Sequence, residues 1–220
     1  MTHKKSFIKC KPQTAQSGVT LVELLVALSI TGIFSLTLYG FLFLHRNVLT
    51  AEEIRISVRE NSRLALDFMT RELRQAGARP VSTGGCISFQ RLTVAEAQRV
   101  TMQYDFRGDL SGLPPDGCPD DPSERVVYLY GEDTQAILRA TGRLGRPQPF
   151  INDVPPGGFL LQYFDRNRSR LTPPLEAPER AAVHAIEVSI RTSQPHPNPL
   201  IVEPISTELR SLVFLPNPPS

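Results

Sequence analysis

The feature that most constrains this chain is an apolar run of 26 residues, Val19–Leu44, in which Glu23 is the only charged side chain. As a helix the run would extend about 39 Å at ~1.5 Å per residue, which is enough to cross a hydrocarbon core of about 30 Å. A secretory signal has an apolar region of about 7–15 residues and a small-residue cleavage site after it. This run is longer, and the segment "HRNVLTAEE" that follows offers a poor site. We therefore expect a membrane anchor.

The charges before the run indicate its orientation. The first 18 residues contain no Asp or Glu but four lysines, namely Lys4, Lys5, Lys9 and Lys11. Basic residues are retained on the cytoplasmic side of a membrane, so residues 45–220 are expected outside. The rest of the chain has 24 − 4 = 20 basic residues against 22 acidic ones. A body so close to neutral gives no general electrostatic reason to bind nucleic acid.

The helical pattern continues beyond the apolar run. No proline occurs between Pro12 and Pro80, and apolar residues recur at spacings of three, four or seven, at Ile54, Val58, Ala65, Met69, Leu73 and Ala76. This is the period of an amphipathic helix, and Arg and Glu, with the pair Glu72–Gln75 among them, are assigned to its solvated side. Gly77 and Pro80 are expected to end it. We predict one helix from about Val19 to Ala76; the alternative is two helices with a break near Arg46–Asn47.

From residue 85 onward the pattern changes to short strands. Segments rich in β-branched and aromatic residues are bounded by Gly, Pro and Asp, as in "RVTMQYDF", "RVVYLYG", "GFLLQYFD", "AVHAIEVSIRT" and "STELRSLVFLP". A hairpin is expected around Gly131–Asp133, and Ile186, Val188 and Ile190 should share one face of a strand. The predicted class is α+β, a long N-terminal helix packed on an antiparallel sheet.

Two cysteines, Cys86 and Cys118, fall in the part of the chain expected outside the membrane, whereas Cys10 precedes the anchor. An oxidising compartment favours a disulfide between the first two, and neither has the CxxC spacing or a nearby His that a metal site would need. Closing a loop of about 31 residues would stabilise the fold by roughly 3–4 kcal/mol.

The sequence contains no recognisable catalytic set. It has no Gly-rich phosphate loop, no G-x-S-x-G and no H-E-x-x-H, and His45, His184 and His196 do not resemble catalytic bases. We expect a protein that is not an enzyme and needs no cofactor or metal. Two weaker alternatives are a calcium ion in the acidic loop with Asp116, Asp120, Asp121 and Glu124, and phosphate or DNA contact by Arg166, Arg168 and Arg170.

Glu23 needs a separate explanation. A carboxylate within the apolar part of a membrane helix costs roughly 2.5–3.5 kcal/mol on insertion scales, so it is functional by default. If the chain were cut after Gly18, Val19 would carry a free amine four residues before Glu23, and residues i and i+4 share a helix face. The carboxylate could equally meet the amine of a neighbouring subunit. A paired charge in a low dielectric costs far less than a lone one, so assembly is the natural function.

The stretch "SGVTLVELLVALSITGIFSL" resembles the class III signal of type IV prepilins and type II secretion pseudopilins. The resemblance implies a leader, residues 1–18, cut by a prepilin peptidase between Gly18 and Val19, methylation of the new N-terminal Val19, and a role for Glu23 in subunit assembly. The family usually has Phe where this chain has Val19. The implied location is the bacterial inner membrane, with the N-terminus cytoplasmic and the C-terminal domain periplasmic, and after assembly a pilus or pseudopilus.

The segment "RENSRLALDFMTRELRQAGARP" is similar to the helix that follows the membrane segment in PilW-like minor pilins and in J-type (GspJ-like) minor pseudopilins. The resemblance implies a minor subunit whose partners are other minor and major subunits, the prepilin peptidase, the inner-membrane assembly platform and membrane lipid. The expected organisation is a leader, 1–18, a transmembrane half-helix, 19–44, an amphipathic half-helix, 45–79, and a β-rich domain, 80–220. An alternative function on the same anchor is a tip-located binding module for adhesion or DNA uptake.

Overall fold

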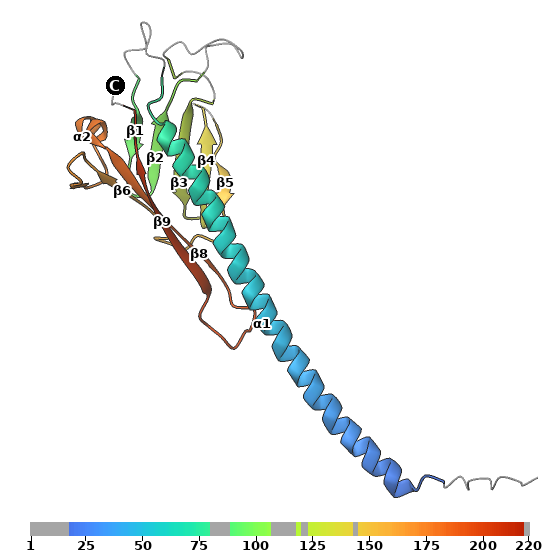
Figure 1. Ribbon diagram of the computed structural model, residues 1–220. Helices are drawn as coiled ribbons and strands as arrows, with labels where there is room; N and C mark the ends of the chain where they lie inside the picture. The colour runs from blue at the N-terminus through green and yellow to red at the C-terminus, as the bar shows by residue number, and fades with distance from the viewer. Residues whose placement is uncertain (1–17, 80–88, 107–117, 120–122, 143–144, 218–220) are drawn as a thin grey trace, which may run out of the picture. The chain divides into compact units, whose positions relative to one another are not determined.

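The computed structural model describes residues 18–79, 89–106, 118–119, 123–142 and 145–217. The chain divides into two compact units, Met1–Asn47 and Val48–Ser220, called unit 1 and unit 2 below. Its elements, in chain order, are α1 (Leu21–Gln75), β1 (Leu92–Ala95), β2 (Arg99–Gln103), β3 (Arg125–Gly131), β4 (Ala136–Thr141), β5 (Gln148–Ile151), β6 (Phe159–Phe164), β7 (Arg170–Leu171), α2 (Ala177–Ala182), β8 (Ala185–Gln194) and β9 (Ile205–Phe214) (Figure 1).

Helix α1 is continuous over 55 residues and shows no break at Arg46–Asn47. It begins at Leu21, two residues later than predicted, because Thr20 caps it: the Glu23 N–H donates to Thr20 Oγ1 at 3.3 Å. It ends at Gln75, and Gly77 follows with φ of 80°, a conformation that favours glycine. A Cβ at Gly77 would lie 2.9 Å from Cγ of Arg91, so this position also has no room for a side chain.

The strands form two antiparallel sheets. Sheet A has the order β1-β2-β3-β4-β5 and sheet B the order β7-β6-β8-β9. The predicted α+β class is confirmed, a long N-terminal helix followed by antiparallel strands, but with two sheets where the sequence suggested one. The chain leaves sheet A through residues 152–158, where Pro155 and Pro156 offer no N–H for a ladder and Gly157 adopts a φ of 70°.

Unit 2 has one apolar core that includes the second half of α1 and both sheets. Met69 and Leu73 of α1 and Ala76, directly after it, are fully buried, as their spacing predicts. On β8 the alternate residues Ile186, Val188 and Ile190 are also fully buried, so the predicted face of this strand is confirmed. The helix therefore covers an interior to which sheet A and sheet B both contribute.

Helix α2 was not predicted, although its sequence carries a start signal. Glu176 precedes it, Pro178 lies in its first turn, and the Glu176 N–H donates to Glu179 Oε2 at 3.0 Å. This is the reciprocal half of a capping box. Arg180 then anchors the helix to sheet A, since its Nε donates to the Leu92 carbonyl at 3.2 Å.

Candidate functional site

The residues around the predicted cut precede α1. Gly18, Val19 and Thr20 are described as irregular chain, and Val19 is exposed. A Cβ built on Gly18 would meet no heavy atom within 4 Å, and its φ is not in the left-handed region. Neither packing nor backbone conformation in the described residues requires glycine here. The described fold therefore gives no structural reason for glycine at position 18.

Glu23 lies in the first turn of α1 and is exposed. The free N–H groups of a helix start make that end partially positive, which stabilises a carboxylate there by about 0.3–1 kcal/mol. Among the described residues the Glu23 carboxylate has no ion pair. The helix start also changes one expectation: Val19 lies before the Thr20 cap, so Val19 and Glu23 do not yet share a helix face.

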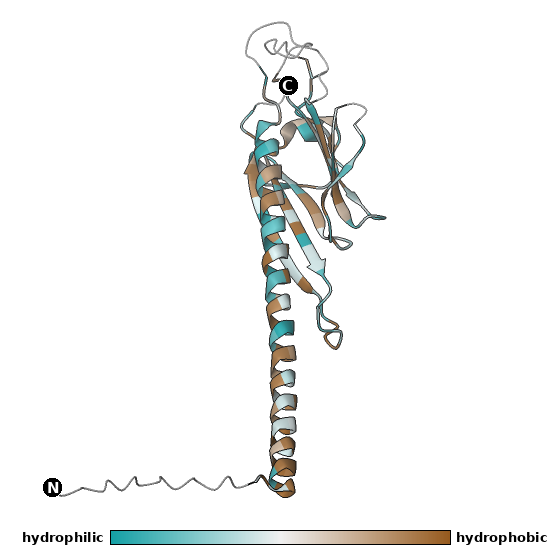
Figure 2. Cartoon of the chain, turned by 90° about the vertical axis from the view of Figure 1, so that its right-hand side faces the viewer, coloured by the Kyte–Doolittle hydropathy of each residue, from teal (hydrophilic) through white to brown (hydrophobic). Residues whose placement is uncertain are grey.

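The first half of α1 is mostly apolar along the face that Figure 2 shows. It contains an 18-residue window of mean hydropathy 2.1, none of which is buried within the molecule, and this is long and apolar enough to cross a membrane. Among the described residues of unit 1, the ring of His45 stacks on that of Phe41, four residues earlier on the helix. Such an extended apolar surface requires a cover from outside the chain, either lipid or other apolar helices.

In the second half of α1, Glu72 is placed differently from its prediction. Instead of facing solvent, it is 9% exposed and accepts hydrogen bonds from the Tyr128 hydroxyl and from Arg139 Nη2 at 2.5 Å. Burial, helped by the Glu72 charge, raises the pKa of Tyr128, and the hydrogen bond to Glu72 raises the pKa of Arg139. Glu72 lies three residues after Met69 and seven after Ala65, so its spacing, unlike its residue type, already placed it on the buried face.

A second buried polar contact links α1 to sheet B. The Ser62 hydroxyl donates to the Val58 carbonyl at 2.7 Å and lies 2.6 Å from Thr192 Oγ1. Because Ser62 has one hydroxyl proton, which goes to Val58, Thr192 must be the donor in the second bond. Both side chains are buried, so the pair fixes the position of β8 against the helix.

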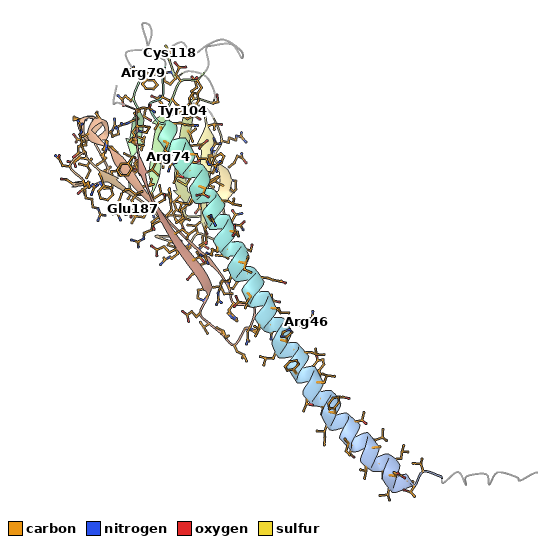
Figure 3. The ribbon with its side chains drawn as sticks, viewed as in Figure 1. Arg46, Arg74, Arg79, Tyr104, Cys118 and Glu187 are labelled. Carbon is orange, nitrogen blue, oxygen red and sulfur yellow. The ribbon has the colours of Figure 1, made fainter. Side chains whose placement is uncertain are left out.

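The predicted disulfide can be followed at one of its two cysteines. Cys118 is disulfide-bonded; Cys86 lies outside the described residues, so the pairing remains a prediction. Figure 3 shows Cys118 at the end of unit 2 where α1 ends. The metal alternative is not tested, since Asp116, Asp120 and Asp121 also lie outside the described residues.

Glu124, the fourth residue of the acidic loop, is turned inward. It is fully buried, and its Oε1 accepts the Phe106 N–H at 2.9 Å. Within the described part of the chain no three His, Cys, Asp or Glu side chains are close enough to hold a metal ion. Glu124 therefore supports the backbone at the end of β2 rather than presenting an open ligand.

The predicted arginine cluster is divided. Arg166 and Arg168 lie in the β6–β7 turn, in which Ser169 N donates to Asp165 Oδ1 at 2.7 Å, and they line a surface hollow of about 520 Å³. The carboxylates of Asp165 and Glu187 and the ring of His184 line the same hollow. Arg170 lies on β7 and is not part of it. The mixed charge does not resemble a phosphate site, which would gather cations alone.

His196 lies in the β8–β9 loop, where Nδ1 accepts the Asn198 N–H.

Residues 13–39 match the family model of the prokaryotic N-terminal methylation motif. No curated protein sequence matches the chain. Among solved structures, a type IV-like pilin from Thermus thermophilus is similar, with a TM-score of 0.43, 12% identity, and coverage of 72% of this chain and 97% of that one. The chain thus carries a methylation motif of the type IV prepilin kind at the start of a long helix that is followed by antiparallel sheets.

Proposed function

We propose that this chain, a bearer of the prepilin-type methylation motif, is a minor pilin or pseudopilin of a type IV pilus or a type II secretion pseudopilus. A prepilin peptidase cuts it between Gly18 and Val19, the Val19 amine is methylated, and the mature protein enters a filament through α1. Its role is structural, in filament assembly or initiation, and not enzymatic.

The observation that carries this proposal is the position of the methylation motif on the helix. The matched segment, residues 13–39, spans the start of α1, so the proposed cut falls in irregular chain. Gly18 and Val19 lie outside the helix, so a peptidase could bind them without unwinding α1, whereas a cut three residues later would require unwinding of the first helical turn.

Glu23 is the proposed assembly residue. Val19 lies outside the helix in the uncut chain. The free amine that cleavage would create on Val19 could pair with the Glu23 carboxylate of the same chain only if α1 then extended by two residues. The amine of an adjacent subunit needs no such change. An ion pair between subunits would neutralise a carboxylate that has no ion pair within the described chain, and it would fix the axial register of neighbouring helices.

Three features support a minor subunit and not a major one. The first is the pair of sheets in unit 2, the second is its short extra helix α2, and the third is the resemblance of the segment Arg59–Pro80 to PilW-like and J-type subunits. The partners proposed are other minor and major subunits, the peptidase and the inner-membrane platform. Arg166 and Arg168 share their surface hollow with Asp165 and Glu187, so this turn gives no specific support to DNA uptake or adhesion as the main function.

The test is mass spectrometry of the mature N-terminus, on protein isolated from cells that contain the filament system. The proposal expects a chain that starts at methylated Val19. Gly18→Val should block the cut, whereas Gly32→Ala is a matched control because a Cβ at Gly32 also meets no heavy atom within 4 Å. A chain that retains Met1, or one cut after residue 44, would refute the proposal.

A further inference from the structure

The loop between β8 and β9, residues 195–204, exposes three consecutive large apolar side chains. Leu200 is 88% exposed, Ile201 44% and Val202 95%. For comparison, the most exposed apolar side chain of α1 is Leu36, at 75%. Contiguous apolar side chains that are exposed to this degree mark a surface that another molecule covers.

Hydrogen bonds within unit 2 show which way the β8–β9 hairpin runs relative to α1. Near the end of the helix, Asn217 Nδ2 donates to the Ala76 carbonyl at 3.0 Å, and Leu215, just after β9, donates its N–H to the His184 carbonyl at 2.9 Å. Near Ser62, fourteen residues earlier on the helix, the contact is with Thr192 of β8. Strand β8 therefore runs antiparallel to α1, and the β8–β9 loop that follows it points toward the start of unit 2.

The loop is long enough to reach that start. Ser62 lies about 21 Å along the helix from Val48, at ~1.5 Å per residue, while the eight residues from Thr192 to Leu200 can extend about 26 Å at ~3.3 Å each. Figures 1 and 2 agree that the loop lies at the end of unit 2 where α1 enters it. The chain leaves unit 2 there toward the apolar run, which ends at Leu44, four residues before Val48.

The backbone of the loop is prepared for an environment poor in water. Four of its ten residues, Pro195, Pro197, Pro199 and Pro204, have no N–H group. Three further N–H groups are satisfied inside the loop: Asn198 N by His196 Nδ1 at 3.1 Å, Leu200 N by Asn198 Oδ1 at 3.0 Å, and Ile201 N by the Asn198 carbonyl at 3.0 Å. Unsatisfied backbone N–H and C=O groups exclude irregular loops from the hydrocarbon core. Seven of the ten positions here have no unsatisfied N–H, and the loop carbonyls can stay hydrated in the interfacial layer, so the loop suits the interface and not the core.

We propose that the Leu200–Val202 triplet inserts into the interfacial layer of the same bilayer that α1 crosses, and so forms a second membrane contact before the subunit enters a filament. The inference rests on the proposed membrane anchoring of α1. The loop contains no Lys or Arg, and Glu203 is its single charged residue. The contact is therefore with the apolar part of the interface and does not require anionic lipid.

Tryptophan fluorescence can test this directly because the chain contains no tryptophan. The full chain with Val202→Trp is reconstituted at high lipid excess in phosphatidylcholine vesicles, with and without a lipid spin-labelled near its headgroup. The control is Leu212→Trp. Leu212 lies on β9, the strand that follows the loop, and is 48% exposed. Since inserted side chains sink about 5–10 Å into the interface, quenching of the residue 202 variant should exceed that of the control about twofold, with emission at shorter wavelength.

Equal quenching and equal emission wavelength in the two variants would overturn the inference. So would a blue shift that is lost when lipid excess is raised further, since this would identify a second copy of the chain as the cover. Leu200→Trp should behave like Val202→Trp, which guards against a local effect of one substitution, and far-ultraviolet circular dichroism checks the fold of each. Flotation of the unmodified chain with the vesicles separates the two claims: failure to float refutes the anchor itself, whereas flotation without quenching refutes only the loop contact.

Discussion

The two halves of α1 solve the same problem in opposite ways. From Val48 to Gln75 the helix buries Ser62 and Glu72, and each has hydrogen-bond partners on a sheet of unit 2. From Leu21 to Asn47 it buries nothing within the molecule, and the Glu23 carboxylate has no ion pair in the described chain. The buried polar groups of the second half have their partners within the chain. The apolar side chains of the first half and the Glu23 carboxylate have none among the described residues, so their partners would be other molecules.

The comparison teaches that the charged residues of one helix have unlike roles. Glu72 stabilises the fold because Arg139 and Tyr128 lie opposite it. Glu23 has no ion pair among the described residues, and within the chain only the helix start favours its charge; the role proposed for it is in contacts between subunits. Substitutions in each half should therefore affect different measurements, assembly in the first and unfolding in the second.

The largest effect is expected for Glu23→Ala. Without the carboxylate, the amine of a neighbouring subunit is left as an unpaired charge in a low dielectric, and removing one partner of a buried ion pair costs about 3 kcal/mol. We expect incorporation into sheared filaments to fall about 100-fold, as measured by quantitative immunoblotting against total membrane protein.

The matched control for Glu23→Ala is Glu53→Ala, an exposed carboxylate on the second half of the same helix. It should incorporate normally. Both variants should unfold in urea as the unmodified chain does. Normal incorporation of Glu23→Ala would remove the contrast between the two halves.

A large effect on stability is expected for Glu72→Ala. It leaves the Arg139 guanidinium and the Tyr128 hydroxyl without their common acceptor, and breaking such a partly buried pair costs about 3 kcal/mol. Urea unfolding of the full chain in detergent, followed by circular dichroism, measures the change. Glu52→Ala, which breaks the exposed Glu52–Arg55 pair, should cost less than about 1 kcal/mol, and equal costs would contradict the burial of Glu72.

A third effect concerns alkaline pH. Burial raises the pKa of Tyr128 and of Tyr163, so the folded chain keeps protons that the unfolded chain releases above about pH 10. This stabilisation is fully present below that pH and is lost as pH rises above it, at about 1.4 kcal/mol per pH unit for each tyrosine. Tyr128→Phe should make the free energy of unfolding less dependent on pH between about 10 and 11.

The control for the alkaline experiment is Tyr39→Phe, because Tyr39 is 71% exposed and belongs to unit 1. It should leave the pH dependence unchanged. A slope that Tyr128→Phe does not reduce would show that this hydroxyl is free to ionise in the folded state.

The smallest effect is expected at the Ser62–Thr192 pair. Ser62→Ala and Thr192→Val each remove one side of a buried hydrogen bond and should each cost about 1–2 kcal/mol. In a double-mutant cycle by urea unfolding, the second substitution should cost about 1 kcal/mol less once the first is made. Additive costs would mean that the two hydroxyls do not interact.

The sequence predicted the elements whose pattern is local. The apolar run and the spacing from Val58 to Ala76 gave α1, and alternation gave β8 with its buried face. The helix start could also have been placed, since "TLVE", Thr20–Glu23, is the S/T-x-x-E pattern of a helix start. Helix α2 has a similar signal at Glu176–Glu179, which strand-like surroundings obscured.

What the sequence could not supply is pairing between distant segments. Nothing local indicates that Glu72 meets Tyr128 and Arg139, which lie 56 and 67 residues further along the chain. The division into two sheets depends in the same way on which strands pair. At the site, Gly18, Val19 and Glu23 could be named from the sequence because they lie within a short linear motif, residues 13–39, whereas the processing and assembly roles proposed for them await test.

The most direct test of the proposal that Glu23 pairs with another subunit is photo-crosslinking from the neighbouring residue. A benzoyl-phenylalanine placed at Leu24, which is 56% exposed, is activated in assembled filaments, and the adducts are sequenced. We predict adducts that join Leu24 to the methylated N-terminal residue, or the one after it, of a different subunit. Adducts to lipid alone, or to the same chain alone, would contradict the assignment of Glu23 to contacts between subunits.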